Sequence, residues 1–80
     1  MHYVYILRSL CIPKQHYVGI TSDPNRRLAE HNTKKVTSTS KYVPWELLAF
    51  VYFHDRQHAI QFERYLKSGS GQAFARRHFW

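Results

Sequence analysis

Two short segments rich in aromatic and β-branched residues stand near the start of the chain, at 2–8 and 16–20. Such residues favour strands. The seven residues between the segments, 9–15, include Pro13 and polar neighbours, which is typical of a loop. A connection this short joins antiparallel strands more simply than parallel ones, which need a long crossover. The sequence therefore predicts a β-hairpin.

The first of these strands carries apolar or aromatic side chains on both faces. Successive side chains of a strand point to opposite sides, so Tyr3, Tyr5 and Leu7 share one face while Val4 and Ile6 share the other. We therefore expect this strand to be covered on both sides.

Two later segments begin with helix-capping residues. Asp23 followed by Pro24 predicts a helix over 24–32, because Asp accepts free backbone N–H groups and Pro suits the first helical position. Asp55 predicts a second helix over 56–68 in the same way.

The remaining segments complete the order of elements. Residues 33–44 are predicted to form a basic, hydroxyl-rich loop, and the nearly all-apolar residues 45–53 a third strand in a central or buried position. Gly69 is expected to close the second helix, and a third helix to begin near residue 71. The order ββαβαα predicts an α+β fold in one domain over 1–80, with a three-stranded antiparallel sheet flanked by helices.

The charge balance points to a polyanionic partner. Lys and Arg number 12 against 5 Asp and Glu, a formal net charge of +7, while 44% hydrophobic residues favour a folded chain. Nucleic acid is the commonest partner of so basic a surface, and plain solubility is the alternative. The single Cys11 excludes an internal disulfide and a cysteine-rich zinc site. The short apolar runs and the first residues predict neither a membrane span nor a signal peptide, so a cytoplasmic location is expected.

Glu63 falls within the apolar stripe of the second predicted helix, flanked by Ala59, Ile60 and Leu66. A buried carboxylate must be paired, protonated or bound to a metal, because unpaired burial is costly. An ion pair with a basic residue such as Arg27 and a metal site are the two readings.

Arg27 and His31 are four residues apart and share a helix face. They could contact a phosphate, or form an ordinary exposed basic face. Paired tyrosines such as Tyr5 and Tyr17 on a sheet are usually packing residues with a hydroxyl at the rim. Gly19 within a strand indicates a bulge or the close approach of another group.

Several short motifs together resemble the GIY-YIG nuclease domain. Tyr3-Val4-Tyr5 and Tyr17-Val18-Gly19 resemble its paired signature, with Tyr3 in place of the first Gly and Val in place of each central Ile. The further matching segments, in order, are 25–28, 30–32, Ser38-Thr39, 44–47 and 62–71. The likeness covers essentially the whole chain and is strongest to small, stand-alone bacterial members with no added DNA-binding domain.

The resemblance implies an endonuclease that hydrolyses phosphodiester bonds of nucleic acid, DNA being favoured, with one divalent metal ion, Mg²⁺ or Mn²⁺. It implies a metal-ligand role for Glu63 and a phosphate-binding role for Arg27. A tyrosine, assisted by histidine, would take the proton from water, and the family likeness leaves open which group does so. The matching catalytic positions are Tyr5, Tyr17, Arg27, His31 and Glu63, with Gly19 keeping the strand open beside them.

Two departures from the family pattern bear on catalysis. Ile20 stands where some members carry Lys, and Val43 where many carry Arg. A catalytically weak or inactive nucleic-acid-binding module is therefore the alternative. We expect basic residues of the 33–44 loop and of the last segment of the chain to contact the nucleic-acid backbone, unless they are merely solvated charges: Lys34, Lys35, Lys41, Arg76 and Arg77.

Overall fold

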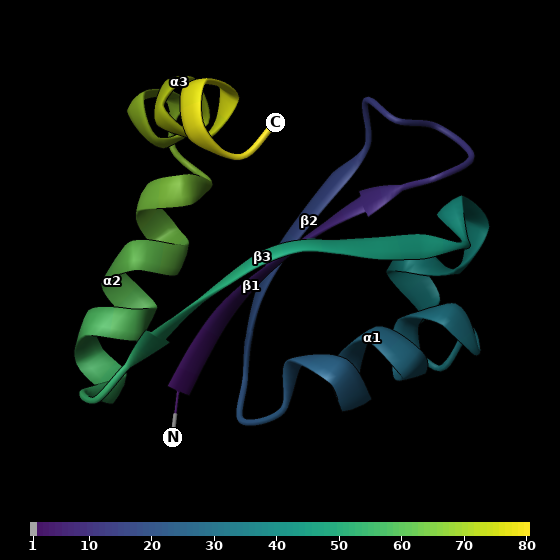
Figure 1. Cartoon of the computed structure of the whole chain (residues 1–80), viewed down its shortest axis with the longest axis horizontal. Helices are drawn as coiled ribbons and strands as arrows, with labels where there is room; N and C mark the ends of the chain where they lie inside the picture. Colours follow the sequence, from purple (N-terminus) through teal and green to yellow (C-terminus); the bar gives the residue numbers. More distant parts are fainter. Residues whose placement is uncertain (1) are drawn as a thin grey trace.

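The computed structural model describes residues 2–80, and a three-stranded sheet runs through its centre (Figure 1). The strands are β1 (His2–Ser9), β2 (His16–Thr21) and β3 (Trp45–Phe53), in the spatial order β2-β1-β3. Both neighbours of β1 are antiparallel to it. The predicted hairpin and the predicted α+β fold are confirmed.

Helical elements cover the two faces of the sheet. They are α1 (Pro24–Asn32), a 3₁₀ helix η1 (Thr37–Tyr42), α2 (Arg56–Leu66) and α3 (Gly69–His78). Figure 1 shows α1 and η1 on one side of the sheet and α2 and α3 on the other. None of the helices within residues 2–80 has the length and apolar character needed to span a bilayer.

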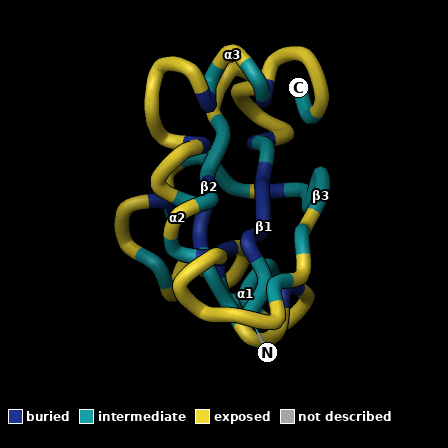
Figure 2. The backbone as a smooth tube through the Cα atoms, turned by 90° about the vertical axis from the view of Figure 1, so that its left-hand side faces the viewer, coloured by how far each residue is buried: buried dark blue, intermediate teal, exposed yellow. Residues whose placement is uncertain are grey.

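Strand β1 is the centre of the core, as the tube coloured by burial shows (Figure 2). Val4 and Ile6 pack with residues of α2 and α3, while Tyr5 and Leu7 pack with Trp45 on the other face. All four β1 side chains are at most 1% exposed. The prediction that this strand is covered on both sides is confirmed.

The predicted central position of the third strand is wrong, because β3 lies at the edge of the sheet. The central place is taken by β1, which supplies side chains to both cores. On β3, Phe50 and Tyr52 remain 51% and 48% exposed, since they belong to neither core cluster. An apolar composition alone did not distinguish a buried strand from one whose aromatic rings stay on the surface.

Both predicted N-caps are confirmed. The carboxylate of Asp23 accepts a hydrogen bond from the backbone N–H of Arg26 at 3.1 Å, and that of Asp55 accepts one from Gln57 at 2.9 Å. These bonds satisfy N–H groups that have no partner inside the helix, so α1 and α2 start where the sequence indicates.

The predicted boundary between the last two helices is wrong. Helix α2 ends at Leu66, and Ser68 caps α3 by accepting a hydrogen bond from Gly71 N–H at 3.2 Å. Gly69 is the first residue of α3 rather than the closing residue of α2. The Ser cap starts α3 two residues earlier than expected. The predicted loop over 33–44 also contains η1.

Candidate active site

The hydroxyl of Tyr5 lies at the centre of the site. On the face of the sheet that α1 covers, its register partner in β2 is Gly19. A Cβ atom at Gly19 would lie 2.7 Å from the Tyr5 hydroxyl oxygen, so only glycine leaves room for the ring. The predicted close approach is therefore confirmed. The β1–β2 pairing runs without a shift from Tyr3 to Arg8, which excludes a bulge there.

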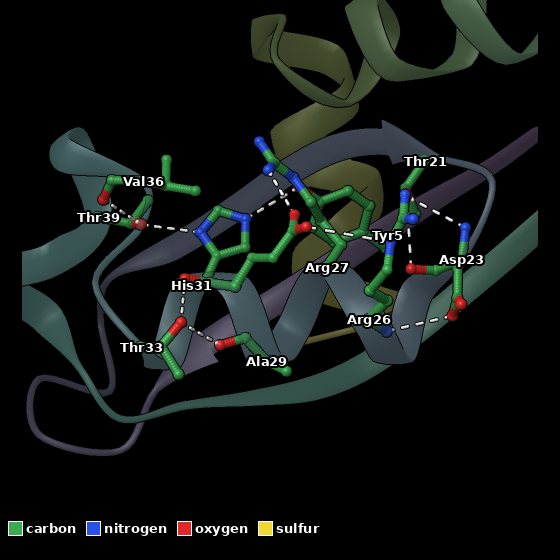
Figure 3. Close-up of polar contacts among 11 residues, drawn as sticks. Tyr5, Thr21, Asp23, Arg26, Arg27, Ala29, His31, Thr33, Val36 and Thr39 are labelled. Carbon is green, nitrogen blue, oxygen red and sulfur yellow. Dashed lines mark hydrogen bonds and ion pairs between the residues drawn. The ribbon is translucent and has the colours of Figure 1, made fainter.

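Helix α1 brings two side chains to this hydroxyl (Figure 3). Nε of Arg27 donates a hydrogen bond to the Tyr5 oxygen at 3.3 Å, and Nε2 of His31 lies 3.0 Å from the same oxygen. Arg27 and His31 are one helical turn apart, so the shared face that the sequence predicts is confirmed. Arg26, one position away, points outward with its side chain 66% exposed.

Hydrogen-bond partners fix the tautomer of His31. The hydroxyl of Thr39 donates to the carbonyl of Val36 at 3.2 Å, so its oxygen is left to accept from Nδ1–H of His31 at 2.7 Å. His31 Nε2 then accepts, and the Tyr5 hydroxyl donates to it. Tyr5, His31 and Thr39 thus form a directed chain of hydrogen bonds that ends on the carbonyl of Val36, just before η1.

Burial keeps both members of this pair neutral. Tyr5 is 1% exposed and His31 is fully buried. Burial, only partly offset by the hydrogen bond from Arg27, raises the pKa of Tyr5 to about 12. Burial, with the nearby charge of Arg27, lowers the pKa of His31 from its usual range. At neutral pH the site therefore holds a protonated phenol beside an unprotonated imidazole.

Glu30 anchors the guanidinium of Arg27. Nη1 of Arg27 donates to Oε1 of Glu30 at 2.9 Å. The hydrogen bond from Arg27 lowers the pKa of Glu30, and the same bond raises the pKa of Arg27 above its usual range. The Arg27 side chain is still 34% exposed, so the guanidinium is held in place with part of its surface open to a ligand.

Tyr17 completes the cluster from β2. The centroid of its ring lies 4.8 Å from that of His31 and 6.0 Å from that of Tyr5. Tyr17 is half-buried, whereas Tyr5 and His31 are closed off. Tyr17 and Arg27 are therefore the members of the cluster that a ligand can reach.

Glu63 lies on α2, the helix on the opposite side of the sheet. Its side chain is 19% exposed, and Oε2 lies 2.7 Å from Nζ of Lys67, one turn further along α2. The ion-pair reading of Glu63 thus fits, although the partner is Lys67 and not Arg27. Lys67 also lines a pocket that includes Tyr17, but no contact joins Glu63 to Tyr5, Arg27 or His31 among the described residues.

Few side chains near the site could coordinate a metal ion. Within residues 2–80, no group of three or more His, Cys, Asp and Glu side chains could hold a metal ion. A single carboxylate such as Glu63 fits a hard cation that keeps most of its waters and takes phosphate oxygens. It does not fit zinc, which needs three or four protein ligands.

The basic residues expected to contact nucleic acid are all exposed. Three of them, Lys34, Lys35 and Lys41, follow α1 on one side of the sheet, and Arg76 and Arg77 lie on α3 on the other side. The structure therefore places them in two separate groups.

Three polar partners in the site had been assigned no role from the sequence. Glu30 and Lys67 stand three and four residues after the side chains they hold, a helical spacing that could have indicated both pairs. Thr39 had no such signal, because its contact with His31 depends on how η1 folds back onto α1.

Comparison with known proteins gives a family match over nearly the whole chain. Residues 1–77 match the GIY-YIG catalytic domain family. The structure-specific endonuclease subunit SLX1 of Debaryomyces hansenii is 41% identical over 71 residues, covering 80% of this chain and 20% of that protein. The subunit of the same name from Ajellomyces capsulatus is 43% identical over 65 residues, covering 74% and 15%.

A homologue of that subunit from Giardia intestinalis is 37% identical over 65 residues, covering 76% of this chain and 18% of that protein. The chain thus spans about a fifth or less of the length of these relatives. All three organisms are eukaryotes, so these relatives do not support the expected likeness to bacterial proteins.

Proposed function

The chain belongs to the GIY-YIG catalytic domain family, and on that premise we propose that it is an endonuclease that hydrolyses phosphodiester bonds of nucleic acid with one divalent metal ion. DNA is the favoured substrate. The relatives named as structure-specific endonuclease subunits support a substrate that is recognised by its structure.

One observation carries the proposal: the Tyr5 hydroxyl joins Arg27 and His31, with Tyr17 beside them. A buried tyrosine hydroxyl normally finds a hydrogen-bond partner, but here both of its partners, at 3.0 and 3.3 Å, are the basic side chains of His31 and Arg27. An arginine that is held by Glu30 yet remains partly open is suited to a phosphate, because its planar donors match phosphate oxygens.

The accessible residues act on the substrate. Arg27 donates hydrogen bonds to the scissile phosphate and stabilises the negative charge that builds up on it. Tyr17 is the residue whose hydroxyl meets the attacking water, because Tyr5 is closed off, and its phenolate form would be the base that takes the proton of that water.

The buried residues Tyr5 and His31 position Arg27 and Tyr17. The Tyr5 hydroxyl accepts a hydrogen bond from Arg27 and donates one to His31, so the guanidinium and helix α1 are held in a fixed position relative to β1. Tyr5 stays protonated and His31 stays unprotonated at neutral pH, so this pair holds Arg27 in place and does not itself exchange a proton with the substrate.

Glu63 is the residue that would hold the metal, since its carboxylate is the oxygen donor that Mg²⁺ or Mn²⁺ prefers. When bound, such an ion polarises the phosphoryl group and stabilises the leaving oxygen. Oε2 of Glu63 is paired with Lys67 at 2.7 Å, so Oε1 is the oxygen that would be left for the metal.

The proposal is tested by incubating the protein with branched, single-stranded and duplex DNA and with the matching RNAs. Each substrate is combined with Mg²⁺, with Mn²⁺ or with a chelator. Metal-dependent strand cleavage supports the proposal, and a preference among the substrates identifies the class. No cleavage of any substrate, with binding intact, would contradict it.

A nucleic-acid-binding module without turnover is the second candidate. The Glu63–Lys67 pair favours it, because an ammonium group already neutralises the carboxylate expected to bind the metal, through its oxygen Oε2. This candidate predicts binding that is independent of Mg²⁺ and no cleavage products at any metal concentration.

A further inference from the structure

A pocket of about 300 Å³ opens beside Tyr17, at the start of β2. Its walls come from the loop before β2, from β2 itself and from the ends of α2 and α3. Figure 1 shows the end of the chain turning from α3 toward this part of the sheet. The polar and aromatic side chains that line it are Lys14, His16, Tyr17, Lys67, Gln72 and Trp80.

The lining of the pocket is cationic. It includes two lysines, Lys14 and Lys67, and no acidic residue. Lys14 is exposed and forms no ion pair within residues 2–80, while Lys67 is paired with Glu63 and is still 54% exposed. The pocket thus presents two ammonium groups, one of them uncompensated, and suits an anion rather than a neutral ligand.

His16 and Trp80 form one wall. Their rings are stacked, with centroids 4.0 Å apart and an angle of 19° between the planes. Nε2 of His16 is buried and has no hydrogen-bond partner among the described side chains and backbone.

The position of the pocket indicates which anion it binds. Tyr17 lines the pocket, although its ring packs beside Tyr5 on the α1 face and Val18 faces α2 and α3. The pocket therefore lies at the β2 edge of the sheet, next to the cluster, and Lys67 joins it to Glu63. A chain of nucleotides whose scissile phosphate rests on Arg27 carries further phosphates within reach on either side. We propose that this pocket is a second phosphate subsite, which binds a backbone phosphate of the nucleic acid next to the one that is hydrolysed. The inference rests on the proposed function.

The subsite gives Lys67 two partners. A phosphate in the pocket attracts the Lys67 ammonium, and this attraction competes with the ion pair to Glu63. Occupation of the subsite by substrate therefore helps to free the Glu63 carboxylate. Lys14 holds the same phosphate without any competing acid within residues 2–80.

The test compares Lys14→Gln with Arg56→Gln. Each removes one positive charge from an exposed side chain, and Arg56 lies at the start of α2, outside the pocket. Binding of a short single-stranded DNA is measured without divalent metal over a range of salt concentrations. Lys14→Gln is expected to weaken binding and to lower the slope of log K against log salt by about 0.7, the value for one phosphate contact on a single strand. Arg56→Gln is expected to leave the slope unchanged.

NMR of the His16 imidazole gives the second readout, with inorganic phosphate as the probe and chloride at equal ionic strength as the control. Burial, with the charge of Arg8, lowers the pKa of His16 in the free protein. Phosphate in the pocket is expected to raise it, and Lys14→Gln to abolish that rise. If phosphate moves the His16 pKa but Lys14→Gln does not alter DNA binding, the pocket binds free phosphate and the proposal is overturned.

Equal salt slopes for the two variants, with no response of His16 to phosphate, would also overturn it. Because cleavage is not needed for either readout, a protein that binds DNA through Lys14 yet never cleaves it would refute the nuclease proposal and leave the subsite standing.

Discussion

The hydroxyl of Tyr5 lies 3.0 Å from Nε2 of His31, with both side chains shut off from solvent. Thr39, on the far side of the imidazole, fixes the direction of this bond from Tyr5 to His31. The buried Tyr5 hydroxyl therefore contacts the neutral His31 imidazole on one side and Arg27 on the other. Arg27 in turn reaches the surface, where a phosphate can bind. Stability and activity should therefore depend on the same few atoms.

Replacing each tyrosine in turn by Phe distinguishes the roles of Tyr5 and Tyr17. Tyr5→Phe leaves His31 Nε2 buried without a hydrogen-bond partner, so the free energy of unfolding should fall by about 1–3 kcal/mol, and cleavage should be lost. Tyr17→Phe should change stability by less than about 0.5 kcal/mol, because Tyr17 is only half-buried, yet it should also abolish cleavage. Urea unfolding and cleavage assays on both variants check this, and equal stability losses would contradict it.

Adding a single methyl group at Gly19 should disturb the site without removing any polar atom. The new Cβ would lie 2.7–2.9 Å from the outer ring atoms of Tyr5, and the buried ring would have to shift away from His31 and Arg27. We expect Gly19→Ala to lower the free energy of unfolding by about 1–3 kcal/mol and to reduce cleavage sharply. Gly69→Ala is the control, because a Cβ there has no neighbour within 4 Å. Wild-type activity in Gly19→Ala would show that the Tyr5 contacts do not matter.

The free energy of unfolding should decrease as the pH falls from about 6.5 toward 5. A histidine titrates near ~6.5 in an unfolded chain, and burial lowers the pKa of His31 and of His16 in the folded protein. The unfolded state then binds more protons in this window, so stability is complete above it and is lost as pH falls. The slope should shrink in His31→Gln and shrink further when His16 is also replaced by Gln. A flat profile in the wild type would exclude a depressed His31 pKa.

The geometry of Arg27, as well as its charge, should be required. Lys cannot donate to Tyr5 and Glu30 together as the guanidinium does. We expect Arg27→Lys to reduce the cleavage rate about 100-fold, the usual effect of losing one donor to a developing negative charge. Arg26→Lys, on the same helix but 66% exposed, should retain the wild-type rate. Comparable rates for the two variants would place Arg27 outside the site.

Local signals predicted most of the fold. The hairpin followed from two strand-like segments and a short connection, and the helix starts followed from Asp23 and Asp55. The edge position of β3 did not follow from such signals. Phe50 and Tyr52 look like core residues in the sequence, and only the packing of α1 and α2 leaves them exposed. The start of α3 was misplaced because the Ser68 cap competes with the glycine signal next to it.

Some residues of the site could be predicted from the sequence, and some of their contacts could not. Helical spacing placed Arg27 and His31 together, and the likeness to a known family indicated Tyr5 and Tyr17. The contact between His31 and Thr39 could not be foreseen, since it joins two elements through a turn whose path no local pattern specifies. Glu63 was identified as a carboxylate in need of a partner, but Arg27 was expected where the structure has Lys67.

The role of Glu63 in metal-dependent cleavage is the central claim, and Glu63→Gln tests it most directly. The single-turnover rate of DNA cleavage is measured against Mg²⁺ concentration for the wild type, for Glu63→Gln and for Glu46→Gln, which removes an acid paired with Arg8 outside the site. We predict that Glu63→Gln keeps DNA binding and loses the Mg²⁺-dependent rate, while Glu46→Gln follows the wild-type curve. A Glu63→Gln protein that cleaves with the wild-type rate and Mg²⁺ dependence would contradict the account.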